Sequence, residues 1–140
     1  MEVFDAALAA DGPPPAEVRL LCSRAAARMG VLEGHVAVQY VSEERIAALN
    51  AAHRGKASPT DVLSFPIDGA EPHAPHAAGA PAGAETLPRE LGDIVICPQH
   101  TADLREAVVH GMLHLLGLDH ETDDGEMLAL QEELLAEAQP

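Results

Sequence analysis

The segment HGMLHLLGLDH at residues 110–120 places three histidines in a mostly apolar run. His110 and His114 are four residues apart, so on a helix their imidazole rings lie one above the other on the same face. This spacing lets one nitrogen of each ring bind a single metal ion at about 2.0–2.1 Å. Gly117 favours the left-handed conformation that ends a helix, and the chain beyond it can bring His120 back toward the first two rings. The segment therefore predicts a metal site with three imidazole ligands.

The ligand set also indicates which ion is bound and what it does. Imidazole suits zinc and other divalent transition metals, whereas magnesium prefers oxygen ligands. Three protein nitrogens that leave a fourth position open are typical of a catalytic zinc site rather than a structural one. We therefore predict one Zn²⁺ per chain, with another divalent transition metal as the alternative. A single histidine on an apolar helix is more often a hydrogen-bonded core residue, but three with a glycine at the turn favour the metal.

The histidine spacing is that of the metzincin pattern H-E-x-x-H-x-x-G-x-x-H, with one difference. Metzincin peptidases carry a glutamate after the first histidine, where it serves as general base. In this chain that position is Gly111. Glycine cannot take a proton from water and pass it to a leaving amine. The difference disfavours a peptidase, although a hydrolase of another class that recruits its base elsewhere stays an alternative.

The composition favours one compact domain without a membrane partner. A chain of 140 residues is long enough to bury one core, and we predict a single domain over residues 1–140. No apolar run is long enough to span a bilayer, and the first residues lack a signal-peptide pattern, so we expect a cytoplasmic protein. Cys22 and Cys97 lie in separate apolar stretches and are expected to be small buried hydrophobic residues.

The charge balance is strongly acidic, with a formal net charge of −15. Nucleic-acid binding usually needs a basic surface, so the charge argues against tight binding of a polyanion, including DNA. The alternative is that the acidic residues form solvated helix faces that keep the protein soluble. Aromatic side chains, which often stack on bases, are limited to two phenylalanines and one tyrosine.

The periodicity of the chain predicts four helices and three strands. Val18, Leu21, Cys22, Ala25 and Met29 fall on one face of the first predicted helix, and Met127, Leu130 and Leu134 point inward from the last. The expected helices are 13–30, 42–53 with Ser42 as N-cap, one from the N-cap Thr101 to Leu116, and 123–138 with Asp123 and Glu126 as a capping box. The expected strands are 35–41, 61–66 and 91–98, the last with too little alternation to leave one face in water.

These elements predict an α+β fold: a small mixed β-sheet packed with helices, with the metal-site helix in the core, as in metzincins. Residues 68–88 are rich in alanine, proline and glycine and lack periodicity, so we expect a low-complexity surface loop there.

Three segments together resemble the YbeY family of metal-dependent endoribonucleases. The segment at 110–120 resembles that family's H-G-x-L-H-L-x-G-x-D-H signature. RGKASPTDVLSFP at 54–66 resembles its R-G-K-x-x-P-T-D-V-L-S-F-P stretch, and LGDIVIC at 91–97 is similar to its L-G-D-I-x-I strand. The segments occur in the family's order, and the resemblance covers roughly residues 35–135.

The resemblance implies a single-strand-specific endoribonuclease that acts in ribosome biogenesis, in 16S rRNA 3′-end maturation and rRNA quality control. Ribosomal RNA and the ribosome or small-subunit assembly proteins would then be its partners. The family's ligands correspond to His110, His114 and His120, and its arginine that acts on the substrate phosphate corresponds to Arg54. Arg54 and His114 are thus the implied catalytic residues. A non-catalytic ribosome-associated zinc protein stays an alternative.

Arg54 and Lys56 are the candidate substrate-binding cations. A guanidinium offers planar, paired donors to phosphate oxygens that an ammonium group does not. Taken from the residues alone, a surface salt bridge is an equally good interpretation of Arg54, and the resemblance favours the phosphate. Lys56 would add a second phosphate contact, although an isolated loop lysine is usually only solvated. Asp119 is a candidate either to orient a histidine ring or to cap the turn.

The acidic composition generates a prediction about RNA binding. We expect the isolated protein to bind naked ribosomal RNA weakly, with a dissociation constant above about 1 μM at physiological salt and a further loss of affinity as salt increases. Fluorescence anisotropy with labelled rRNA fragments at several salt concentrations measures both quantities. Tight binding at physiological salt would contradict the view that a partner brings this protein to its RNA.

Overall fold

The computed structural model describes residues 2–4, 13–67, 90–119 and 121–138 of the chain. Its elements in order are β1 (Glu2–Phe4), α1 (Pro15–Arg28), β2 (His35–Tyr40), α2 (Glu43–Arg54), β3 (Val62–Pro66), β4 (Glu90–Ile96), the short 3₁₀ helix η3 (Pro98–His100), α3 (Leu104–Leu115) and α4 (Glu126–Ala138). The low-complexity segment 68–88 lies outside the described residues.

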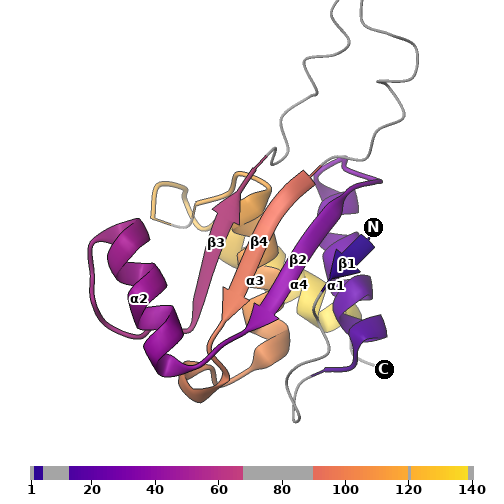
Figure 1. Cartoon of the computed structure of the whole chain (residues 1–140). Helices are drawn as coiled ribbons and strands as arrows, with labels where there is room; N and C mark the ends of the chain where they lie inside the picture. The colour runs from indigo at the N-terminus through magenta and orange to yellow at the C-terminus, as the bar shows by residue number, and fades with distance from the viewer. Residues whose placement is uncertain (1, 5–12, 68–89, 120, 139–140) are drawn as a thin grey trace, which may run out of the picture.

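The described strands form one mixed four-stranded sheet with the order β1-β2-β4-β3 (Figure 1). β1, β2 and β4 run parallel, and β3 pairs antiparallel with β4. The α+β class and the mixed sheet are therefore confirmed. β1 was not predicted, because a strand of three residues is too short to show a period of two.

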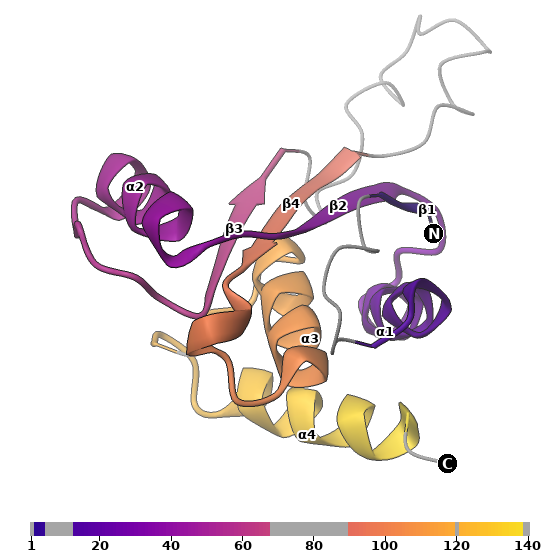
Figure 2. The same cartoon turned by 60° about the horizontal axis from the view of Figure 1, so that its bottom comes forward.

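β4 is one of the two interior strands and is buried on both faces, as its sequence predicted. Ile94 and Ile96 belong to the main core, which α1, α3 and α4 cover. Val95 points the other way and packs with Leu63 and with Ile46 of α2 in a second, smaller cluster. Figure 2 shows the same division, with α2 on one side of the sheet and the other three helices on the opposite side.

α3 is the most deeply buried helix and contacts β3, β4, α1 and α4. Val108, Val109, Met112 and Leu113 are fully buried on it. The helix that carries the first two histidines therefore lies in the core, as expected. In the part of the chain that the structure describes, no helix is long and apolar enough to cross a membrane.

The first helix follows its predicted face except at its end. Val18, Leu21 and Cys22 are buried, whereas Met29, predicted on the same face, is 37% exposed. The helix ends at Arg28, so Met29 leaves the helical path and its side chain no longer follows the apolar face. Cys22 has no exposed surface, and burial raises the pKa of its thiol to about 12, which makes it unreactive at neutral pH.

Helix caps were predicted correctly at Ser42 and wrongly at Thr101. The Ser42 hydroxyl accepts a hydrogen bond from Arg45 N at 3.2 Å. α3 starts later than expected, because the Asp103 carboxylate accepts from Arg105 N and Glu106 N and is the true N-cap. Thr101 instead donates to Cys97 O at 2.7 Å and closes the turn around η3.

Asp123 and Glu126, predicted as a capping box, both accept hydrogen bonds from amide groups at the start of α4. The Asp123 carboxylate accepts from Gly125 N at 2.8 Å and Met127 N at 2.9 Å, and the Glu126 carboxylate accepts from Asp124 N at 2.7 Å. Both predicted residues therefore satisfy amide groups at this helix end. The helix itself begins at Glu126, three residues after the predicted start, because residues 123–125 form the capping turn.

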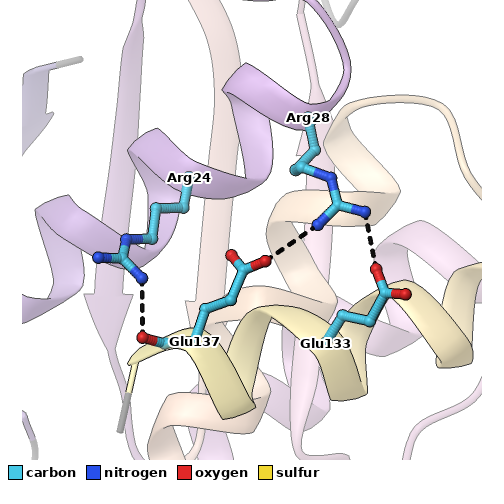
Figure 3. A network of polar contacts seen from close by, with 4 residues as sticks. All are labelled: Arg24, Arg28, Glu133 and Glu137. Carbon is cyan, nitrogen blue, oxygen red and sulfur yellow. Dashed lines mark hydrogen bonds and ion pairs between the residues drawn. The ribbon is translucent and has the colours of Figure 1, made fainter. Parts of the chain in front are cut away.

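α4 is attached to the rest of the fold by two buried apolar residues and an exposed ion-pair network. Met127 and Leu134 insert into the core. At the surface, Arg28 of α1 contacts Glu133 at 2.7 Å and Glu137 at 3.3 Å, while Arg24 donates to Glu137 O (Figure 3). Exposed pairs of this kind contribute at most about 1 kcal/mol each, so the apolar contacts dominate the attachment.

Gly92 of β4 gives a test of how tightly the sheet packs. Gly92 has a φ of +143°, and an added Cβ would lie 2.3 Å from Phe65 O and 2.9 Å from Leu115 Cδ2. We expect Gly92→Ala to lower the free energy of unfolding by more than about 3 kcal/mol. The matched control is Gly30→Ala, with a φ of +80° and no atom within 4 Å, which should cost about 1 kcal/mol. Urea denaturation measures both, and equal losses would contradict the packing argument.

Candidate metal centre and active-site cleft

His110 and His114 open from α3 into a cleft of about 530 Å³. The other walls come from separate parts of the chain: the end of α2 with His53 and Arg54, residues 60–64 leading into β3, and the turn after α3 that contains Asp119. The structure therefore brings together Arg54 and the first two predicted ligands, which are more than fifty residues apart in the sequence.

The two rings have the separation that a shared ion needs. The Nε2 atoms of His110 and His114 are 3.2 Å apart, and the rings meet edge to face with centroids 4.7 Å apart. Two nitrogens bound tetrahedrally to zinc at 2.0–2.1 Å are separated by about 3.3–3.4 Å. His120 lies outside the described residues, and among the described residues no group of three potential metal ligands occurs. The three-histidine metal centre thus stays a prediction.

The opposite ring nitrogens are held by carbonyl oxygens. His114 Nδ1 lies 3.0 Å from Leu118 O, and His110 Nδ1 lies 2.9 Å from Gln131 Oε1. A backbone carbonyl only accepts, so Nδ1 of His114 carries the proton, and in the neutral ring Nε2 then presents its lone pair. When His110 Nδ1 likewise donates to Gln131 Oε1, the lone pair on His110 Nε2 points at the lone pair on His114 Nε2. Two lone pairs repel each other unless a proton or a cation lies between them. This donor set fits a divalent metal ion.

Gly111 explains why the metzincin glutamate has no place here. A Cβ on Gly111 would lie 2.6 Å from Ile94 Cγ2 and 3.3 Å from Ser64 Oγ, so position 111 faces the sheet and not the cleft. The Ser64 hydroxyl donates to Gly111 O at 2.9 Å and joins β3 to α3 at the same point. A general base at position 111 would collide with the sheet, which is a structural reason against the peptidase alternative.

Arg54 is the last residue of α2, where the sequence predicted a loop. Gly55 follows with a φ of +73° and ends the helix as its left-handed C-cap. Asn50 Nδ2 donates to Ser58 O at 2.9 Å and ties the returning chain to the helix. The exposed Arg54 side chain lines the cleft, whereas Lys56 is exposed and is not among the residues that line it. The substrate roles of both residues stay predictions.

The described walls of the cleft carry more negative than positive charge. Asp61, Asp119 and Glu121 oppose the single arginine, Arg54. Asp119 Oδ1 accepts from Glu121 N at 2.9 Å, so this carboxylate caps the turn, which is one of the two roles considered for it. Without a bound cation, these walls repel a phosphate group.

Two features close to the histidines and the cleft were not predicted from the sequence. Gln131 follows Met127 by four residues and therefore occupies an inward position, a signal that a buried polar group there needs a partner. His53 packs against Phe65 with ring centroids 4.6 Å apart and adds an aromatic surface at the edge of the cleft. No sequence signal predicted that pair, because its two members belong to different elements.

Comparison with known proteins decides the family. A family model described as Endoribonuclease YbeY matches residues 16–139, a longer span than the resembling motifs indicated. The chain belongs to the endoribonuclease YbeY family. YbeY proteins are nucleases of a metal-dependent family, and the family resemblance predicted from the three motifs is therefore confirmed.

Individual YbeY relatives agree over most of the chain. The protein called Endoribonuclease YbeY from Geobacillus kaustophilus is 40% identical, covering 85% of this chain and 83% of its own length. The Thermobifida fusca YbeY is 42% identical, covering 72% and 70%. A solution structure from Thermotoga maritima, with a TM-score of 0.52 and 24% identity over 98% of this chain and 87% of that one, shows the fold.

Gly111→Ala tests the close approach of α3 to the sheet. Helix propensity alone predicts a stabilisation of about 0.5–1 kcal/mol, because alanine replaces a helical glycine. The contact with Ile94 predicts the opposite sign, a loss of about 1–3 kcal/mol, because the branched Cγ2 atom cannot move aside.

The control for this prediction is the same change made in an Ile94→Ala background, which removes Cγ2. There the loss should shrink or turn into a gain, as measured by urea denaturation of the four proteins in a double-mutant cycle. A stabilised Gly111→Ala single variant would show that the helix does not need glycine at this position.

Proposed function

We propose that this YbeY protein is a cytoplasmic, zinc-dependent, single-strand-specific endoribonuclease of ribosome biogenesis, acting in 16S rRNA 3′-end maturation and rRNA quality control. The observation that carries the proposal is the shared cleft of His110, His114 and Arg54 in a member of this family. The similarity to proteins called endoribonucleases supports the RNA substrate, and the geometry of the two rings supports the ion.

The metal would be held by His110 and His114, with His120 as the proposed third ligand. When bound, zinc supplies Lewis acidity: it polarises a phosphoryl oxygen and makes water more acidic. The protein holds both described rings in the ligand geometry through Leu118 O and Gln131 Oε1. With Gly111 against the sheet, the chain offers no carboxylate at the metzincin base position.

Arg54 would act on the substrate phosphate from the opposite wall of the cleft. Its position at the end of α2 leaves the guanidinium exposed and facing the same cavity as the histidines. Cleavage of a phosphodiester builds negative charge on the phosphate oxygens, and paired guanidinium donors stabilise that charge. Lys56, two residues further on, would contact a neighbouring phosphate of the strand outside the cleft.

Ribosome or small-subunit assembly proteins would bring this enzyme to its ribosomal RNA. The net charge of −15 and the carboxylates of the cleft oppose binding of free RNA or DNA. A protein partner would supply the affinity for RNA that the enzyme's own electrostatic field does not. Cleavage would then depend on binding to that partner and not on a basic surface.

Cleavage assays on purified variants test the proposal. The zinc-loaded protein should cleave a labelled single-stranded RNA, leave the matching duplex and casein intact, and lose activity with a chelator. We expect His114→Ala to remove a ligand and abolish cleavage, and Arg54→Ala to reduce the rate by about 10²–10³-fold with zinc binding retained. Arg45→Ala, which changes an exposed arginine of α2 outside the cleft, should cleave at the wild-type rate.

The alternatives give different results in the same assays. Casein cleavage without RNA cleavage would indicate a peptidase-like hydrolase. Unfolding on metal removal, with no cleavage of either substrate, would indicate a structural zinc in a binding protein. RNA cleavage that persists in His114→Ala and Arg54→Ala would reveal a contaminating nuclease and contradict the proposed site.

A further inference from the structure

Gln131 is a buried polar side chain of α4 that contacts one of the proposed metal ligands. Only 7% of its surface is exposed, and it sits on the inward face of α4 with Met127 and Leu134. Its Oε1 atom lies 2.9 Å from His110 Nδ1. An amide in this position costs desolvation that leucine or methionine would not, so the hydrogen bond to the histidine is its physical justification.

The partner of Nδ1 decides which nitrogen of His110 is available to a metal. A neutral imidazole carries one proton, on either Nδ1 or Nε2. When Nδ1 donates to Gln131 Oε1, the lone pair is on Nε2, the atom that lies 3.2 Å from His114 Nε2. When the proton is on Nε2, that atom donates to His114 Nε2 and is closed to an ion.

We infer that Gln131 is a positioning residue of the metal centre: its amide oxygen selects the Nδ1-protonated tautomer of His110 and orients the ring. The inference rests on the proposed metal site and adds a residue from a different helix to it. His114 is oriented by a backbone oxygen, Leu118 O, which no substitution removes. Of the two groups that orient the ligand rings, Gln131 is therefore the one that a substitution can remove.

The position of Gln131 is fixed by how α4 packs. Met127 and Leu134 anchor the helix on either side of it, and the contacts of Arg24 and Arg28 with α4 hold the far end (Figure 3). The His110 ring is thus supported by an element that lies well beyond the histidine motif in the sequence.

Three substitutions separate positioning from packing. Gln131→Met keeps the side-chain volume and removes the acceptor. Gln131→Glu keeps an acceptor and removes the amide donor, so it favours only the metal-binding tautomer. The matched control is Gln99→Met, because the Gln99 amide oxygen accepts from Glu43 N and not from a histidine.

Zinc affinity is measured on the purified full chain by competition with a chelating dye. We expect Gln131→Met to bind zinc about 10–100-fold more weakly than the wild type. Gln131→Glu should bind at least as tightly as the wild type, and Gln99→Met should be unchanged. Thermal melting of each metal-free protein reports whether the fold is retained.

Ring ¹⁵N chemical shifts of His110, recorded at a pH of about 8.5, give a second readout. We expect the zinc-loaded wild type to carry the proton on Nδ1 and bind the ion through Nε2. We expect the Nε2-protonated form to increase in metal-free Gln131→Met. A wild-type protein that binds zinc through His110 Nδ1 contradicts the inference, whichever variants fold.

The two proposals fail in distinguishable ways. Equal zinc affinity of the wild type and Gln131→Met overturns the positioning role and leaves the metal site in place. A wild type that binds no zinc or other divalent transition metal overturns the proposed metal site and the inference together.

Discussion

The contact between Gly111 and Ile94 is the constraint on which the cleft depends. It lets α3 lie directly on β3 and β4, and the Ser64 bond to Gly111 O fixes the helix there. His110 and His114 are then displaced by about 60–100° around the helix from the face that touches the sheet. A larger residue at 111 would lift the whole helix and separate both rings from Arg54. The packing of α3 on the sheet therefore requires glycine at position 111, and the absence of the metzincin glutamate follows from this requirement.

The sequence predicted what depends on local spacing. The i, i+4 histidines, the Ser42 cap and the apolar run of β4 each follow from neighbours along the chain, and the structure has all three. It did not predict Asp103 as the cap of α3, because Thr101 is an equally good candidate two residues earlier and only the turn at η3 separates them. Gln131 was missed for a different reason: its spacing from Met127 indicates an inward position, but its partner belongs to another helix, and the sequence pattern does not indicate which residue that is.

The acidic composition has more than one structural role. Part of the negative charge of α4 is paired with one arginine of α1, Arg28, so it contributes to packing and not only to solubility. Other acidic residues, which lie outside α4, line the cleft beside Arg54. The carboxylates of the cleft attract a divalent cation and repel a phosphate group. A phosphate can therefore approach only when that cation and Arg54 offset the negative charge. The composition that argues against nucleic-acid binding thus suits an enzyme whose substrate contact depends on a metal.

The division of the core by the sheet has a consequence for how such a site can vary. Arg54 belongs to a helix packed through Ile46 on the small cluster, while the histidines belong to α3, whose apolar residues pack in the large one. The wall that carries Arg54 and the wall that carries the two histidines are thus supported by separate layers on opposite faces of the sheet. Under the proposed function, mutations beneath α2 would move the arginine without disturbing the two histidine rings. Substrate preference and metal chemistry would in this way be open to independent evolutionary adjustment.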